Sequence, residues 1–180
     1  MTLDGTVINI IKGSVANPMW SPDGNRLAFT CDNYGVSFNM CVTDANGENI
    51  LKFQSRKQIN GYFSKWSPDS KKLLYIAGSG YTRDFHVLWP EDNIDKKFAT
   101  INYIHINGKF LDYDYQWSPD SQWLLIGGTP DQTNIYLANG TVKYTAPVIC
   151  DLQAKCHGFE NNLDGIVILK LEWAKNITPR

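Results

Sequence analysis

Three residues with soft metal-binding side chains, Cys150, Cys156 and His157, lie close together in this 180-residue chain. Thiolate and imidazole groups are preferred zinc ligands, but the Cys-x5-Cys-His spacing matches no common zinc pattern. A fourth ligand is not evident in the neighbouring sequence. We therefore expect a structural loop at this position, with no metal and no other cofactor.

The other groups that could do chemistry are scattered along the chain. Asp112 and Asp114 could act as paired carboxylates, but they approach Trp117 with strand-like alternation, and we expect them at a loop or channel rim. His86 and His105 stand alone, and a lone histidine is more often hydrogen-bonded to nearby carbonyl groups. The sequence contains no Gly-x-Ser-x-Gly elbow, no His-Glu-x-x-His pair and no glycine-rich phosphate loop. It predicts that this chain is not an enzyme and has no catalytic residue.

The most regular spacing in the chain belongs to the tetrapeptide Trp-Ser-Pro-Asp, which occurs three times. Its copies begin 46 and then 51 residues apart. Proline sets φ for the second position of a type I turn, and an aspartate side chain accepts hydrogen bonds from its own turn. The repeated residues are Trp20, Pro22 and Asp23, then Trp66, Pro68 and Asp69, then Trp117, Pro119 and Asp120. Because each Asp recurs at the same place, we expect it to stabilise a hairpin turn.

Each copy of the turn is followed by short apolar stretches that indicate further strands. Four antiparallel strands in a unit of about 40 to 50 residues are typical of a β-propeller blade. The predicted fold class is therefore all-β, a β-propeller of four-stranded antiparallel blades, with three clear blades and a partial or diverged fourth. The expected blades cover about 15–54, 59–102 and 110–146, the partial blade covers 147–180, and 4–11 supplies a strand of a neighbouring blade.

Residues 1–180 would then form one propeller domain or a segment of one. Either the chain closes as a compact four-bladed ring, or it belongs to a larger ring, and we favour the second. The repeated tryptophan is predicted to be a wedge between neighbouring blades, because a large ring fills a tapering gap. A segment would expose an apolar blade face, which self-association could cover.

The turn sequence Trp20 to Gly24, with the later segment Val42 to Gly47, resembles the repeat of TolB-type, WD40-like β-propellers. The likeness extends over about residues 5 to 145. It implies a scaffold that binds proteins in the bacterial cell envelope, in a periplasmic or extracellular location. The printed N-terminus has no signal-peptide pattern.

The composition restricts the possible partners. With 17 basic and 18 acidic residues the formal net charge is −1, so no electrostatic footprint for nucleic acid or an anionic membrane appears. No apolar stretch reaches transmembrane length. We expect a protein partner, no nucleic acid and no membrane insertion.

Loops that differ between repeats are the expected contact sites, because the repeats themselves form the scaffold. The candidate binding residues on these loops are mostly tyrosines: Tyr34, Tyr81, Arg83, Tyr103, Tyr113 and Tyr115. The leading hypothesis is a non-enzymatic binding scaffold. The alternative is the gating or substrate-access propeller of a larger enzyme, such as a prolyl-oligopeptidase-like serine peptidase. Carbohydrate binding or lysis is a third, less supported possibility.

The four cysteines leave the redox compartment open. Cys31 and Cys41 lie on the second and third predicted strands of the first repeat, where a hairpin could place them opposite one another. A cross-strand disulfide needs narrow geometry, so half-buried free thiols are the preferred interpretation. The same two alternatives apply to Cys150 and Cys156.

Overall fold

The structure is a computed structural model, and it describes ten stretches of the chain. These are residues 11, 13–31, 39–53, 59–78, 82–102, 115–126, 134–137, 143–145, 148–153 and 155–158. The chain falls into two compact units: residues 1–79 with 87–96 form the first, and residues 80–86 with 97–180 form the second.

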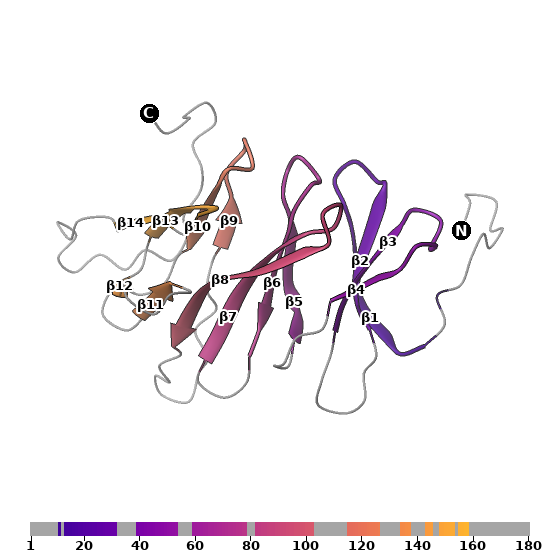
Figure 1. The fold of residues 1–180 in the computed structure, drawn as a ribbon, viewed down its shortest axis with the longest axis horizontal. Helices are drawn as coiled ribbons and strands as arrows, with labels where there is room; N and C mark the ends of the chain where they lie inside the picture. The colour runs from indigo at the N-terminus through magenta and orange to yellow at the C-terminus, as the bar shows by residue number, and fades with distance from the viewer. Residues whose placement is uncertain are drawn as a thin grey trace. The chain divides into compact units, whose positions relative to one another are not determined.

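The first Trp-Ser-Pro-Asp repeat forms a four-stranded antiparallel sheet, coloured indigo to violet in Figure 1. Its strands follow the chain order: β1 (Val15–Trp20), β2 (Arg26–Cys31), β3 (Asn39–Asp44) and β4 (Leu51–Phe53). The register of β1 against β2 shifts between Ala16 and Met19, and Asn17 within this bulge has a positive φ of 53°. This shift places Val15 and Trp20 on the same face of the sheet.

The second repeat begins a six-stranded sheet with the order β12-β11-β8-β7-β6-β5. Four of its strands are consecutive in the chain: β5 (Ile59–Trp66), β6 (Leu73–Ala77), β7 (Thr82–Trp89) and β8 (Ile94–Asn102). All five residues of β6 are buried. A continuous apolar run is what a strand covered on both faces requires, and it explains why β6 shows no polar alternation.

The third repeat departs from the expected boundaries. Its first strands, β9 (Tyr115–Trp117) and β10 (Trp123–Ile126), pair with β13 (Val148–Asp151) and β14 (Cys156–Gly158) in the order β14-β13-β10-β9. The strands predicted to complete this repeat, β11 (Asn134–Leu137) and β12 (Lys143–Thr145), instead extend the second sheet at β8.

The pairing predicted for β11 and β12 is therefore wrong, and residues 148–158, expected in a partial fourth blade, complete the third sheet. Pairing with β8 satisfies backbone groups along an edge that would otherwise be open. A repeat period in the sequence gives the order of strands but not the sheet edge that each strand joins. The predicted strand at 4–11 lies outside the described residues apart from Ile11, as does the segment 159–180.

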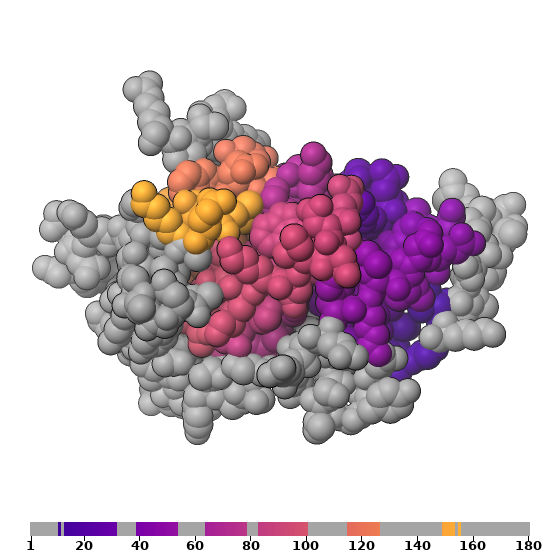
Figure 2. All heavy atoms as spheres, in the orientation of Figure 1, coloured from indigo at the N-terminus to yellow at the C-terminus, as the bar shows by residue number. Residues whose placement is uncertain are grey.

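One apolar core lies between the first sheet and the β5–β6 hairpin, within the first compact unit. Its buried members are Ala28, Met40, Val42, Phe53, Trp66, Leu73, Tyr75, Ala77 and Leu88, with Met19 packed against them. Figure 2 shows the atoms of the first sheet, indigo to violet, meeting those of the magenta strands that follow. Two sheets that bury facing side chains in this way are the basic unit of propeller packing.

The described residues form strands and turns and contain no helix. The first two repeats each run through four consecutive antiparallel strands, which is the meander of a propeller blade. The predicted fold class, all-β with antiparallel blades of the β-propeller type, is confirmed.

Candidate interaction surface

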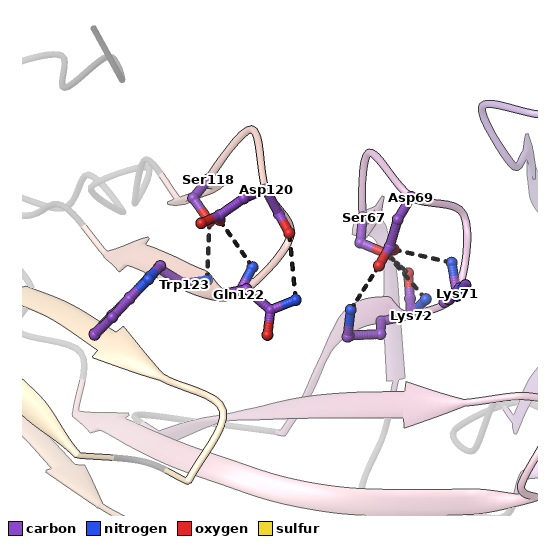
Figure 3. Close-up of polar contacts among 8 residues, drawn as sticks. All are labelled: Ser67, Asp69, Lys71, Lys72, Ser118, Asp120, Gln122 and Trp123. Atoms are coloured by element: carbon purple, nitrogen blue, oxygen red, sulfur yellow. Dashed lines mark hydrogen bonds and ion pairs between the residues drawn. The ribbon is translucent and has the colours of Figure 1, made fainter. Parts of the chain in front are cut away.

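The Trp-Ser-Pro-Asp turns share one hydrogen-bond pattern, which Figure 3 shows for the second and third copies. In the second copy, the Ser70 amide donates to the Ser67 carbonyl at 2.9 Å, and the Ser67 amide donates to the Lys72 carbonyl at 2.8 Å. The Ser67 hydroxyl donates to Asp69 Oδ1 at 2.5 Å and accepts from the Lys72 amide at 2.9 Å. The first and third copies repeat these four contacts within about 0.1 Å. The predicted hairpin turn is thus present at each copy.

The position after each aspartate adopts a left-handed backbone. Gly24, Ser70 and Ser121 have φ values of 73°, 61° and 61°. The bond from each serine amide to the carbonyl five residues later closes a four-residue hairpin connection. Such loops are most often built around a type I turn, and glycine adopts the left-handed conformation without strain. Ser70 tolerates it while its hydroxyl accepts a hydrogen bond from the Asp23 amide at 3.0 Å, which links the turns of the first two repeats.

The turn carboxylates are occupied by these contacts. Hydrogen bonds from the Ser21 hydroxyl and the Asn25 amide lower the pKa of Asp23 below its ordinary value. Burial raises the pKa of Asp69, but hydrogen bonds from Lys72 and Ser67 outweigh it and leave this pKa lowered. Lys72 Nζ lies 2.8 Å from Asp69 Oδ2. These carboxylates stay ionised and stabilise their own turns, as the sequence predicted.

The three repeated tryptophans do not share one environment. Trp66 and Trp117 are each 7% exposed, whereas Trp20 is 53% exposed. Trp66 packs against the first sheet, and its Nε1 donates to the Met19 carbonyl at 3.1 Å. The wedge prediction therefore does not hold for Trp20, because no sheet among the described residues covers that side of β1.

Cys31 and Cys41 form a disulfide between β2 and β3, with Cα atoms 6.0 Å apart. Cys41 pairs in register with Phe29, and Cys31 pairs with Asn39, so the bridge is diagonal. The preferred interpretation of free thiols is wrong for this pair. The sequence left the disulfide open as an alternative, because the number of residues between the two cysteines does not set the register of β2 against β3.

Cys150 is also disulfide-bonded, and the β13–β14 register places Cys156 directly opposite it. A disulfide sulfur is not a thiolate ligand, so this bond agrees with the expectation of a structural loop. The side chains of Cys156 and His157 lie outside the described residues. Within the part of the chain that the structure describes, no group of three potential metal-binding side chains occurs.

Most of the predicted contact residues lie outside the described residues: Tyr34, Tyr81, Tyr103 and Tyr113, and with them Asp112, Asp114 and His105. Arg83 and His86 lie half-buried on β7. Tyr115 lies on β9, is 3% exposed and contacts Phe85 edge to face, with ring centroids 5.7 Å apart. Tyr115 is a core residue, so the loop-contact prediction fails at this position.

Two polar contacts were not foreseen from the sequence. The buried Tyr75 hydroxyl donates to Asp95 Oδ2 at 2.6 Å, and burial together with that carboxylate raises the pKa of Tyr75. The Thr100 hydroxyl donates to Asp84 Oδ1 at 2.6 Å, and Asp84 is 4% exposed. The first contact joins β6 to β8 past the intervening strand β7, and the second joins the neighbouring strands β7 and β8. No spacing signal in the sequence relates these residues. Both serve to satisfy buried polar groups.

The sequence predicted an exposed apolar blade face for a propeller segment, but it did not identify Trp20 as one of the exposed residues. We define the Trp20 face as Val15, Trp20, Leu27, Phe29 and Cys31, which the β1–β2 register places on one side of the sheet. Val15 is 46% exposed and Trp20 53%, while Phe29 and Cys31 are buried with Ile11 packed against them. An exposed indole beside a rigid apolar sheet is a typical anchor for protein contacts.

The described residues contain no helix long and apolar enough to span a bilayer. No protein-family model matches the chain, and no curated protein does either.

Three solved structures that are similar to this chain illustrate the likeness. An oligogalacturonate lyase in complex with manganese has a TM-score of 0.49 and 13% identity, over 74% of this chain and 36% of the other. A putative TolB from Agrobacterium tumefaciens has a TM-score of 0.46 and 16% identity, over 72% and 44%. The β-propeller domain of the Trilobed protease from Pyrococcus furiosus has a TM-score of 0.47 and 16% identity, over 72% and 40%. The chain spans less than half the length of these proteins.

Proposed function

We propose that this chain is a non-enzymatic, protein-binding scaffold of the TolB-like β-propeller type. The Trp20 face carries the proposal, because a half-exposed indole on a rigid sheet offers binding energy that the fold itself does not use. The loops that differ between the repeats, with Tyr34 and Tyr81, would add specificity to this contact.

The two disulfide-bonded sheets support a periplasmic or extracellular location. Cys31 is bonded to Cys41, Cys150 is also oxidised, and no free cysteine occurs among the described residues. Disulfides persist in oxidising compartments and are rare in the cytosol. The protein can be unfolded and alkylated without any added reductant. Mass spectrometry should then find no alkylated cysteine. Alkylation of Cys31 and Cys41 without added reductant would count against this location.

Site-specific photo-crosslinking tests the scaffold role. A photoreactive residue placed at position 34 or 81 should crosslink a discrete protein in the compartment where the chain resides. The matched control is Asp92, an exposed turn residue that belongs to no proposed contact surface. Equal crosslinking from position 92 and from the two loop positions would show contact without a site and would reject the proposal.

The proposal also states that the chain has no catalytic activity of its own. The turn carboxylates are committed to hydrogen bonds within their turns, which supports a structural role for them. Oligogalacturonate with added manganese is the sharpest substrate to try, because a lyase of that specificity is among the similar structures. We expect no formation of unsaturated product. Turnover by the wild-type chain would overturn the non-enzymatic assignment if the Asp120→Asn and Asp69→Asn variants remain folded but lose that turnover.

A further inference from the structure

Asparagine side chains that precede glycine are prone to lose their amide group spontaneously. The next backbone nitrogen attacks the side-chain carbonyl carbon, and glycine has no Cβ to crowd that approach. The chain contains four such pairs: Asn46-Gly47, Asn60-Gly61, Asn107-Gly108 and Asn139-Gly140. The last two pairs lie outside the described residues. The structure therefore allows a comparison of the first pair with the second.

Asn46 lies in the turn between β3 and β4, where its side chain is exposed. Within the part of the chain that the structure describes, its side-chain amide makes no hydrogen bond. Gly47, which supplies the attacking nitrogen, has a left-handed φ of 79°. A surface turn of this kind opens locally at low cost, so the nitrogen can reach the side-chain carbon without global unfolding.

Asn60 has the same glycine neighbour but a different backbone setting. It lies within β5 and pairs in register with Ile76 of β6, and Gly61 belongs to the same strand. All five residues of β6 are buried. Ring closure at Asn60 turns the backbone away from the extended conformation, so this buried pairing must open first. Opening of a core strand requires much more free energy than opening of a surface turn.

Asp44 holds the reactive turn in place. Its Oδ1 accepts hydrogen bonds from the Asn46 amide at 3.1 Å and from the Glu48 amide at 2.8 Å. Its backbone carbonyl accepts from the Gly47 amide at 3.0 Å, and this bond occupies the nitrogen that must attack. The ionised carboxylate also disfavours the negative charge that forms on this nitrogen when it loses its proton. Asp44 therefore slows the reaction in the folded chain.

We infer that Asn46 is a site of spontaneous deamidation in the folded protein and that Asp44 sets its rate. The Gly47 amide loses its proton to solvent, and its nitrogen forms a bond to the side-chain carbonyl carbon of Asn46. The side-chain carbon–nitrogen bond breaks, and ammonia leaves after taking a proton from solvent, which gives a five-membered succinimide. Water then opens either carbonyl of this ring and produces aspartate or isoaspartate. Both products add a negative charge to the turn.

Ageing of the purified, folded chain at mildly alkaline pH tests the inference, with circular dichroism to confirm that it stays folded. After reduction, trypsin releases Asn46 in peptide 27–52 and Asn60 in peptide 58–65, so mass spectrometry follows them separately. Conversion at position 46 should be at least about tenfold faster than at position 60, because only the surface turn opens readily. In urea the two positions should convert at similar rates. Similar rates in the folded chain would overturn the inference.

Two variants assign the reaction to its residues. Asn46→Gln keeps an amide, but ring closure would then need a six-membered ring, so conversion at position 46 should disappear. Asp44→Ala should speed conversion at position 46 several-fold and leave position 60 unchanged. Acceleration at both positions would show a general loss of stability and would overturn the role of Asp44. None of these results depends on the proposed scaffold function, which the crosslinking experiment tests separately.

Discussion

Replacing Trp66 with alanine tests the packing of the first two repeats directly. A tryptophan side chain offers up to about 250 Å² of surface, and Trp66 is only 7% exposed. At about 25 cal/mol per Å², burial of about 200 Å² stabilises the fold by about 5 kcal/mol, an upper estimate. Mutational losses for buried aromatic residues run at about 3 to 5 kcal/mol. We therefore expect Trp66→Ala to lower the free energy of unfolding by about 4 kcal/mol.

Trp20→Ala is the matched comparison, because the same residue of the same motif is 53% exposed. Its loss should be about 2 kcal/mol or less, in proportion to the smaller buried area. Urea unfolding followed by circular dichroism gives both values. Trp66→Phe should cost about 2 kcal/mol, since the ring remains but the Met19 carbonyl loses its donor. Equal losses for Trp66→Ala and Trp20→Ala would refute the reasoning.

Three further perturbations follow from particular contacts. Replacing both Cys31 and Cys41 with alanine should lower the free energy of unfolding by about 3 kcal/mol, because the unfolded chain regains the entropy of a loop of about ten residues. An unchanged urea midpoint would contradict this. Ser70→Gly should leave thermal stability nearly unchanged, because relief of the left-handed backbone strain offsets the lost hydrogen bond from the Asp23 amide. Ser70→Ala loses the same hydrogen bond but keeps the strain, so it should cost about 1 kcal/mol more. Hydrogen bonds from the Glu48 amide and the Asn49 side chain lower the pKa of Asp44 in the folded state. The stability that ionised Asp44 gives the fold is therefore present above the unfolded pKa of 3.8, and it is lost as pH falls through the folded pKa. The Asp44→Asn variant should show a smaller fall in the free energy of unfolding at acid pH. An unchanged pH dependence would show that Asp44 is not the cause of that fall.

Much of the local structure could be predicted from sequence because it depends on short-range chemistry. The tetrapeptide ending in Asp23 or Asp69 encodes its own turn: proline sets one dihedral angle, and the serine and aspartate side chains satisfy nearby amides. The buried run of β6 similarly predicts a strand covered on both faces. These features need only residues that are close along the chain, and repetition made their interpretation secure.

The candidate interaction surface could not be predicted in the same way. Trp20 and Trp66 begin the same motif, and only the packing of the first sheet on Trp66 separates the exposed indole from the buried one. Tyr115 also looked like a loop residue until the edge-to-face contact with Phe85 placed it in the core. Burial depends on what another segment covers, and sequence spacing does not contain that information.

The sequence by itself determined the repeating hairpins, the all-β class and the near-neutral charge, because composition and local turn chemistry fix them. Only the tertiary structure decided that Cys31 and Cys41 are bridged, that β11 and β12 join the second sheet, and that Trp20 is left partly in solvent. Each of these depends on strand register or on contact between distant segments. A shift of one residue in register would move a side chain to the opposite face of its sheet.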